Sequence, residues 1–200
     1  MEKILEYLDN AYHPLCILLY GSYANGTNNA HSDFDCLLIV QEKSVSHDAS
    51  FVDGVQLDAF LYTREEIRTL RDCEEVIQVF DARILRDTDG LASALVARIN
   101  RYIDDNRMST PQSKAQDRQW LEKMIRRAGR GDAEGNYRLH WALVDSLPIY
   151  CSLRDLYYHG PKKTISIIRQ NDPDGYVLLA RALQQSDCDS LNDWVRHVIA

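Results

Sequence analysis

The chain has 200 residues, of which 45% are hydrophobic and 26% charged, as is typical of a soluble globular protein with one domain or two small ones. No apolar run approaches the roughly 20 residues that a membrane-spanning helix needs, and the polar start does not resemble a signal peptide, so we expect a cytoplasmic protein. The five cysteines are an odd number without a Cys-x-x-Cys spacing. They indicate reduced core residues and exclude a disulfide framework or a zinc site.

The net charge of −7 is unevenly distributed along the chain. Residues 1–60 hold nine acidic side chains and two lysines, whereas acids and bases are balanced in the other 140 residues. A clustered negative field favours divalent cations or a cationic ligand as partners. It argues against a nucleic-acid backbone as the main partner.

The first half of the sequence has the pattern of an α/β domain. A helical spacing at residues 1–12 precedes apolar runs at 15–20 and 34–40, which are continuous and typical of strands buried on both faces. A third run, at 55–62, alternates with period two. The sequence also predicts a capped helix after Thr63, one or two strands within 76–85, and a helix over 89–103.

The second half of the sequence has helical spacing throughout. Residues 104–113 are polar and contain a proline, so we expect one domain at 1–106 and another at 107–200. The longest helix is expected at 134–158, with a kink at Pro148. The other helices are expected at 112–130, 161–169, 173–185 and 190–200.

The pattern that carries chemistry begins where the first strand-like run ends. Gly21 and Ser22 are followed by ten residues and then by Asp33-Phe34-Asp35. Two carboxylates at positions i and i+2 of a strand point to the same side, where they repel each other unless a cation or a proton is shared. Such a pair suits Mg²⁺, while Gly21 and Ser22 suit a phosphate. Asp58 lies on a neighbouring strand-like run and is a candidate third carboxylate.

This pattern resembles the signature of the DNA-polymerase-β-like nucleotidyltransferase superfamily. Its residues here are GSYANGTNNAHSDFD together with Asp58. The resemblance implies an α+β fold, with a small mixed β-sheet and flanking helices in the catalytic domain. The second half resembles the all-α helical domain of the aminoglycoside and lincosamide nucleotidyltransferases, which implies a substrate-binding role for residues 107–200.

The same resemblance implies a reaction and its cofactors. A nucleoside monophosphate, expected to be AMP from ATP, is transferred to a hydroxyl of a small acceptor with the help of two Mg²⁺ ions. Asp33 and Asp35 are the expected metal ligands, and Asp58 is either a further ligand or the general base. Gly21 and Ser22 are expected to hold phosphates.

Two weaker candidates lie in the second half of the sequence. Trp141 and Asp145 share a stripe of the longest helix and are candidates for acceptor binding, although a solvated helix face explains them equally well. Lys162 and Lys163 begin a helix, where positive charge is unfavourable for the helix itself. They are candidates for nucleotide binding, with a plain surface as the alternative.

Two other functions remain open from the sequence. One is an antitoxin of a toxin–antitoxin pair that adenylylates a protein partner, although such antitoxins usually lack a long helical domain. The other is a nucleotide-binding module without catalysis. The identity of the acceptor, the preferred nucleotide and the oligomeric state are not encoded in any pattern that we recognise.

Overall fold

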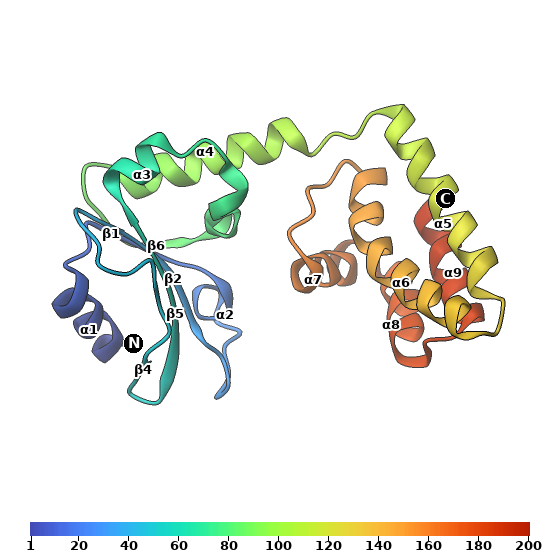
Figure 1. Ribbon diagram of the computed structural model, residues 1–200, viewed down its shortest axis with the longest axis horizontal. Coiled ribbons are helices and arrows are strands. Elements are labelled where there is room, and N and C mark those ends of the chain that lie inside the picture. The colour runs from blue at the N-terminus through green and yellow to red at the C-terminus, as the bar shows by residue number, and fades with distance from the viewer. The chain divides into compact units, whose positions relative to one another are not determined.

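The computed structural model describes all 200 residues, which form two compact units, Met1–Tyr102 and Ile103–Ala200 (Figure 1). The α+β class is confirmed, because the first unit contains the whole β-sheet and the second contains only helices. The division falls within a helix, α4 (Leu91–Asn106), whose last residue coincides with the domain boundary expected from the sequence.

The first unit is built on a six-stranded mixed sheet in the order β3-β5-β2-β1-β6, with β4 paired to β5 as well. Only β2 and β5 run parallel to each other, and the remaining neighbours are antiparallel. The strands are β1 (Cys16–Leu19), β2 (Phe34–Val40), β3 (His47–Asp48), β4 (Phe51–Val52), β5 (Val55–Thr63) and β6 (Arg83–Asp87).

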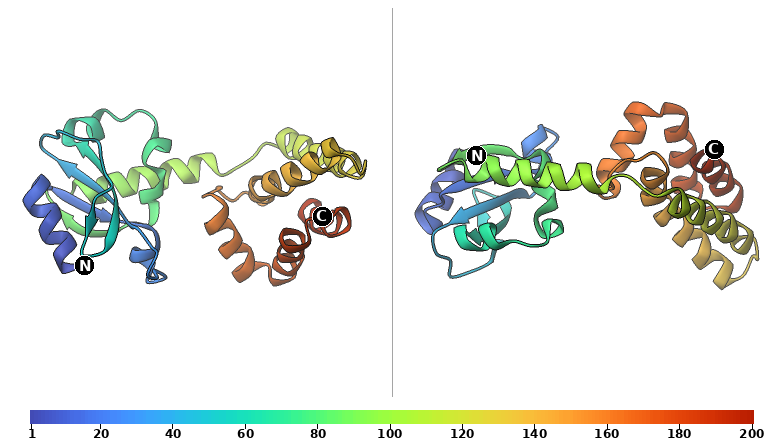
Figure 2. Two further views of the ribbon diagram at one scale, coloured as in Figure 1. Left: turned by 60° about the horizontal axis from the view of Figure 1, so that its bottom comes forward. Right: turned by 90° about the horizontal axis from the view of Figure 1, so that it is seen from above.

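Helices cover both faces of this sheet (Figure 2). Helix α1 (Glu2–Tyr12) packs its buried Ile4 and Leu8 against one face of the sheet. That face is formed by alternate residues of β1, β2 and β5. Helices α3 (Arg64–Thr69) and α4 lie on the other side of the sheet. Burial on both faces explains why β1 and β2 are continuous apolar runs.

The segment 76–85 differs from its prediction. One or two strands were expected there, and one strand, β6, begins at Arg83. The residues before it, Cys73–Asp81, instead form two short 3₁₀ pieces, η1, which meet at a kink at Val76. Val76 and Val79 are both buried, so the apolar residues of this run serve the core without forming a strand. A short apolar run does not by itself distinguish the two structures.

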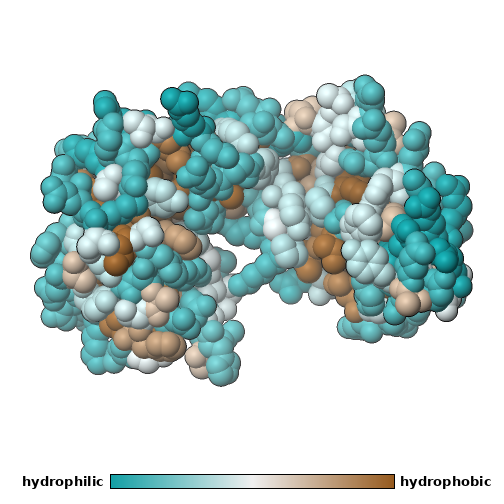
Figure 3. All heavy atoms as spheres, viewed as in Figure 1, coloured by the Kyte–Doolittle hydropathy of each residue, from teal (hydrophilic) through white to brown (hydrophobic).

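The second unit is a bundle around α6 (Ala133–Leu153), which packs against α5 (Pro111–Ala128), α7 (Pro161–Asn171) and α9 (Cys188–Ile199). Helix α8 (Pro173–Gln185) packs against α7 and α9. Helix α6 continues through Pro148 without a break and ends five residues earlier than expected. On the face shown in Figure 3, hydrophilic atoms dominate and hydrophobic atoms surface in separate patches.

A fully buried tryptophan fixes the centre of the bundle. The Trp194 indole Nε1 donates a hydrogen bond of 2.8 Å to the Ser146 hydroxyl, which is also buried. The indole stacks on Tyr150 with ring centroids 5.8 Å apart. The bundle therefore satisfies the one polar atom of its largest core side chain. No helix of the chain is both long and apolar enough to cross a membrane.

Candidate active site at the end of strands β2 and β5

The turn after β1 places its residues against the start of β2. Strand β1 ends at Leu19, and α2 (Gly21–Asn25) begins two residues later. The Tyr20 main-chain N–H donates a hydrogen bond of 3.0 Å to the main-chain oxygen of Asp35. The turn is thus joined to the strand that carries the Asp-x-Asp sequence.

Gly21 is required at this turn for two independent reasons. Its φ of +66° lies in the left-handed region that side chains disfavour. In addition, a methyl group at this position would overlap the carboxylate of Asp35. The absence of a side chain at Gly21 therefore leaves the space that the Asp35 carboxylate occupies.

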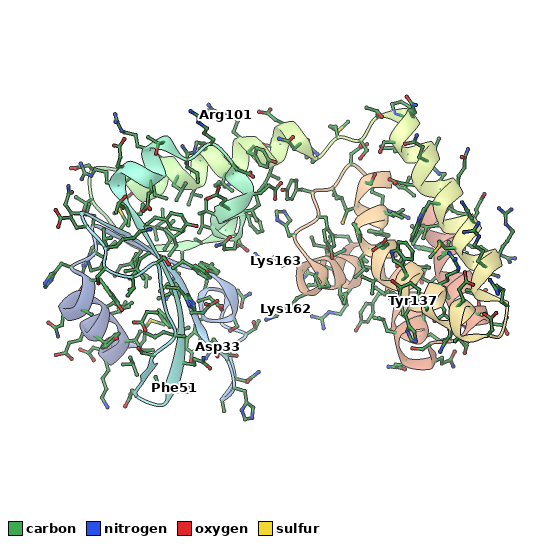
Figure 4. The ribbon with its side chains drawn as sticks, viewed as in Figure 1. Asp33, Phe51, Arg101, Tyr137, Lys162 and Lys163 are labelled. Atoms are coloured by element: carbon green, nitrogen blue, oxygen red, sulfur yellow. The ribbon has the colours of Figure 1, made fainter.

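Asp35 and Asp58 are direct neighbours in the sheet. The two residues are partners in the parallel register of β2 and β5, so their side chains point to the same face. Both are partly exposed, whereas the residues that follow Asp35 in β2 are fully buried. Asp33 is exposed one residue before β2 begins and lies at that end of the sheet (Figure 4).

The structure also places Ser22 in this turn. Its side chain is buried. Its main-chain oxygen accepts the N–H of Thr27 at 3.0 Å, which closes the short helix. Ser22 thus has a fixed backbone in the turn that adjoins Asp35.

The carboxylates exert their charge on two buried side chains nearby. Burial raises the pKa of the Tyr20 hydroxyl, and the negative charges of Asp58 and Asp35 raise it further. Burial likewise raises the pKa of the Cys36 thiol, again reinforced by Asp35 and Asp58. Both groups stay protonated at neutral pH, so the only anions in this part of the sheet are the carboxylates.

His47 is a site residue that the sequence analysis missed. It lies on β3, and its Nε2 is 2.6 Å from Asp58 Oδ1. No motif pointed to it, because β3 has only two residues and exists through its pairing with β5. The only signal in the sequence was a histidine shortly before an alternating strand.

The carboxylate pair fits a divalent cation that shares its coordination with a substrate. No group of three or more His, Cys, Asp or Glu side chains forms a complete metal site by itself. Mg²⁺, however, usually takes one or two protein carboxylates and completes its shell with phosphate oxygens and water. Asp35 and Asp58, which are neighbours in the sheet, would supply this protein share.

The candidate acceptor residues lie in the helical unit, on α6. Trp141 Nε1 donates a hydrogen bond of 2.7 Å to Asp145 Oδ2. Trp120 of α5 and Tyr137 of α6 flank the indole, with ring centroids 5.7 and 5.9 Å from it. Trp141 and Tyr137 are exposed, so the structure groups an aromatic surface with a carboxylate.

Lys162 and Lys163 lie in the first turn of α7, directly after Pro161 (Figure 4). The side chain of Lys162 is exposed, and that of Lys163 is partly buried. These lysines, Trp141 and Asp145 belong to the second unit, whereas the carboxylates, Gly21 and Ser22 belong to the first. The first unit alone thus brings together Gly21, Ser22, Asp35 and Asp58, with Asp33 beside them.

Comparison with known proteins finds a family match within the first unit. Residues 2–90 match the model of the polymerase beta nucleotidyltransferase family. A solved structure of a nucleotidyltransferase-like protein from Exiguobacterium sibiricum 255-15 is 15% identical, with 98% of this chain and 71% of that chain covered and a TM-score of 0.40. A chain from a toxin–antitoxin structure with AMP-PNP is 19% identical, with coverages of 50% and 84% and a TM-score of 0.33. No curated protein matches the sequence.

Proposed function

Since residues 2–90 belong to the polymerase beta nucleotidyltransferase family, we propose that this protein transfers AMP from ATP to a hydroxyl group of a small-molecule acceptor. The observation that supports the proposal most directly is the register of the sheet. It places Asp58 of β5 beside Asp35 of β2. Asp35 is the second aspartate of the Asp-x-Asp sequence that follows the Gly-Ser turn. Those are the groups that phosphoryl transfer needs at one place.

Asp33, Asp35 and Asp58 are the residues that would hold Mg²⁺. When bound, this ion neutralises charge on the triphosphate and on the leaving pyrophosphate. The protein contributes Asp33 just before β2, Asp35 at the start of β2 and Asp58 beside it in β5. No lysine or arginine forms an ion pair with Asp33 or Asp58, and the partner of Asp58 is His47. The protein also contributes Gly21, whose lack of a side chain leaves room for the Asp35 carboxylate.

Each remaining group has a defined part in the transfer. The acceptor oxygen forms a bond to the α-phosphorus, the bond from that phosphorus to the bridging oxygen breaks, and pyrophosphate leaves. Asp58 takes the proton of the acceptor hydroxyl, which requires its carboxylate to be ionised. The Ser22 hydroxyl donates a hydrogen bond to a phosphate oxygen.

For the acceptor, we propose a compound of the aminoglycoside or lincosamide type. Trp141 and Tyr137 offer ring faces to an amine or a sugar, and the Asp145 carboxylate lies within hydrogen-bond distance of the Trp141 indole. A carboxylate and aromatic faces together suit a cationic, hydroxylated molecule. The acidic excess of the first 60 residues also favours a positively charged acceptor.

The decisive experiment follows the label of α-³²P-ATP. The protein is incubated with Mg²⁺ and a panel of amino-sugars, lincosamide-like compounds and neutral polyols, and both labelled product and pyrophosphate are measured. We expect label on a cationic member of the panel and an equal amount of pyrophosphate. Asp35→Asn protein is the control, because it keeps the fold and lacks one carboxylate.

The same experiment distinguishes the other two functions. Label that enters a protein of the host extract, with none on the small molecules, would show that the acceptor is a protein. Binding of Mg²⁺-ATP without release of pyrophosphate under any condition would reduce the site to a nucleotide-binding module.

A further inference from the structure

The histidine beside Asp58 has a fixed position. His47 pairs with Phe60 in the antiparallel register of β3 and β5. Its ring also packs on the Phe60 ring, with centroids 4.7 Å apart and an angle of 36° between the planes. Backbone pairing and ring contact together leave the imidazole little freedom to turn away from Asp58.

The hydrogen bond between His47 and Asp58 has a defined direction. His47 Nε2 and Asp58 Oδ1 are 2.6 Å apart. An ionised carboxylate only accepts hydrogen bonds, so the Nε2–H group of the imidazole is the donor. One of the two Asp58 oxygens is therefore engaged, while Oδ2 has no hydrogen bond to His47.

Stability does not explain this contact. The side chains of His47 and Asp58 are 40% and 38% exposed. Ion pairs and hydrogen bonds at this exposure contribute little to the free energy of unfolding. The contact does, however, restrict the torsion of a carboxylate that lies directly beside Asp35.

We propose that His47 is a positioning residue for Asp58. By holding Oδ1, it directs Oδ2 toward the cation and the acceptor hydroxyl. Asp58 then binds the cation or takes the proton through Oδ2 alone. Ligating carboxylates are commonly fixed in this way by a hydrogen-bond donor behind them, and removal of such a donor costs about 10- to 100-fold in metal affinity or activity. The inference rests on the function proposed above.

Two substitutions at His47 separate the donor from the ring. His47→Phe keeps the ring contact with Phe60 and removes the N–H group, whereas His47→Gln restores a donor without the ring. Lys3→Ala is the matched control, because it removes the partner of another exposed aspartate, Asp53, at 2.7 Å in the same unit. The measurements are kcat and KM for ATP, the affinity for Mn²⁺ by calorimetry with a non-hydrolysable ATP analogue, and the melting temperature.

We expect His47→Phe to lower kcat and the Mn²⁺ affinity by about 10- to 100-fold each, with KM for ATP and the melting temperature unchanged. His47→Gln should recover most of the loss, and Lys3→Ala should match the wild type. A lower kcat with unchanged Mn²⁺ affinity also supports the inference, with Asp58 positioned as the base.

Three results would overturn the inference. One is a His47→Phe protein with wild-type kcat and Mn²⁺ affinity, and another is an equal loss in Lys3→Ala. The third is a loss that His47→Gln does not recover and that follows a lower melting temperature, since that would be a structural role. A wild-type protein that neither binds Mn²⁺ with the nucleotide nor releases pyrophosphate would instead reject the proposed function, and this inference with it.

Discussion

Two groups of aspartates, one in each unit, differ in what lies next to them. In the helical unit, Asp132, Asp172 and Asp187 cap the N-termini of α6, α8 and α9. Others are held by cations, such as Asp155 by Lys114 at 2.6 Å. In the sheet unit, Asp35 and Asp58 lie beside each other in neighbouring strands, where two negative charges repel each other.

This difference separates aspartates that stabilise the fold from those that the fold tolerates. A capping aspartate lowers the free energy of the folded state, so its loss is felt as a loss of stability. A carboxylate held next to another one gives no such benefit, and its presence is explained by a ligand. Substitutions in the two groups should therefore have opposite consequences for stability and activity.

The largest effect is expected from the carboxylate pair. Asp35→Asn and Asp58→Asn should each lower the rate of AMP transfer by about 1,000-fold or more, because each removes charge where the transition state needs it. Stability should stay equal or increase, since repulsion between the two carboxylates is relieved. Initial rates of pyrophosphate release and urea unfolding curves measure the two quantities.

Asp53→Asn is the control for this pair, because Asp53 is exposed and contacts only Lys3. It should leave the rate unchanged. Near-normal activity of either Asp35→Asn or Asp58→Asn would contradict the assignment of the site.

The next largest effect is expected at Gly21. Gly21→Ala should lower the transfer rate by about 100-fold, a change of about 2.7 kcal/mol, because the added methyl group displaces the Asp35 carboxylate. Gly54→Ala is a matched control, since Gly54 also has a positive φ, +81°, but has open space around it. Both variants should lose about 1–2 kcal/mol of stability from the left-handed backbone.

Comparison of the two glycine variants isolates the overlap with Asp35 from the backbone strain. Equal activity in Gly21→Ala and Gly54→Ala would mean that the close approach of Gly21 to Asp35 has no function.

A smaller effect, on stability alone, is expected in the helical unit at Asp172. Burial acts to raise the pKa of Asp172, but hydrogen bonds from His197, the Gly175 N–H and Tyr150 hold it below its ordinary value. A lowered pKa in the folded state adds stability at pH values above the unfolded pKa, and this part is lost as the pH falls through the folded pKa. Unfolding should therefore become easier below about pH 4.

Asp172→Ala should cost about 1–2 kcal/mol at pH 7 and flatten this dependence on pH. Tryptophan fluorescence measures it selectively, because Trp120, Trp141 and Trp194 all belong to the helical unit. Asp189→Ala, in the first turn of α9, should change stability by less than about 0.5 kcal/mol. A wild-type protein whose stability does not fall in acid would contradict this account of Asp172.

Local patterns predicted much of the fold and part of the site. Because β1 and β2 are buried on both faces, their sequences are continuous apolar runs, which predicted both strands. The spacing from Gly21 to Asp35 predicted the turn between them. The position of Asp58 beside Asp35 depends on a parallel register between segments that are distant in the sequence, which no local pattern encodes. The same is true of His47, whose strand exists only through its partner β5.

The smallest effect is expected on the exposed face of α6, at Asp145 and Trp141. Asp145 is bonded to Trp141 by a hydrogen bond of 2.7 Å, so it resembles the paired aspartates of its own unit. The exposed rings of Trp141 and Tyr137 nevertheless leave an aromatic surface uncovered, which suits a ligand. The pair thus stabilises a helix face or binds the acceptor, and kinetics separates the two roles.

If the pair binds the acceptor, Asp145→Ala should raise KM for the acceptor by about 3- to 10-fold, without change in kcat or in KM for ATP, because uniform binding is lost. Asp145→Asn keeps an oxygen that accepts the hydrogen bond of the indole but removes the negative charge. It should therefore show the same rise in KM for a cationic substrate. A neutral polyol should not distinguish Asp145→Asn from the wild type. Unchanged KM in both variants would assign Trp141 and Asp145 to the helix surface alone, and the paired aspartates of the helical unit would then all be structural.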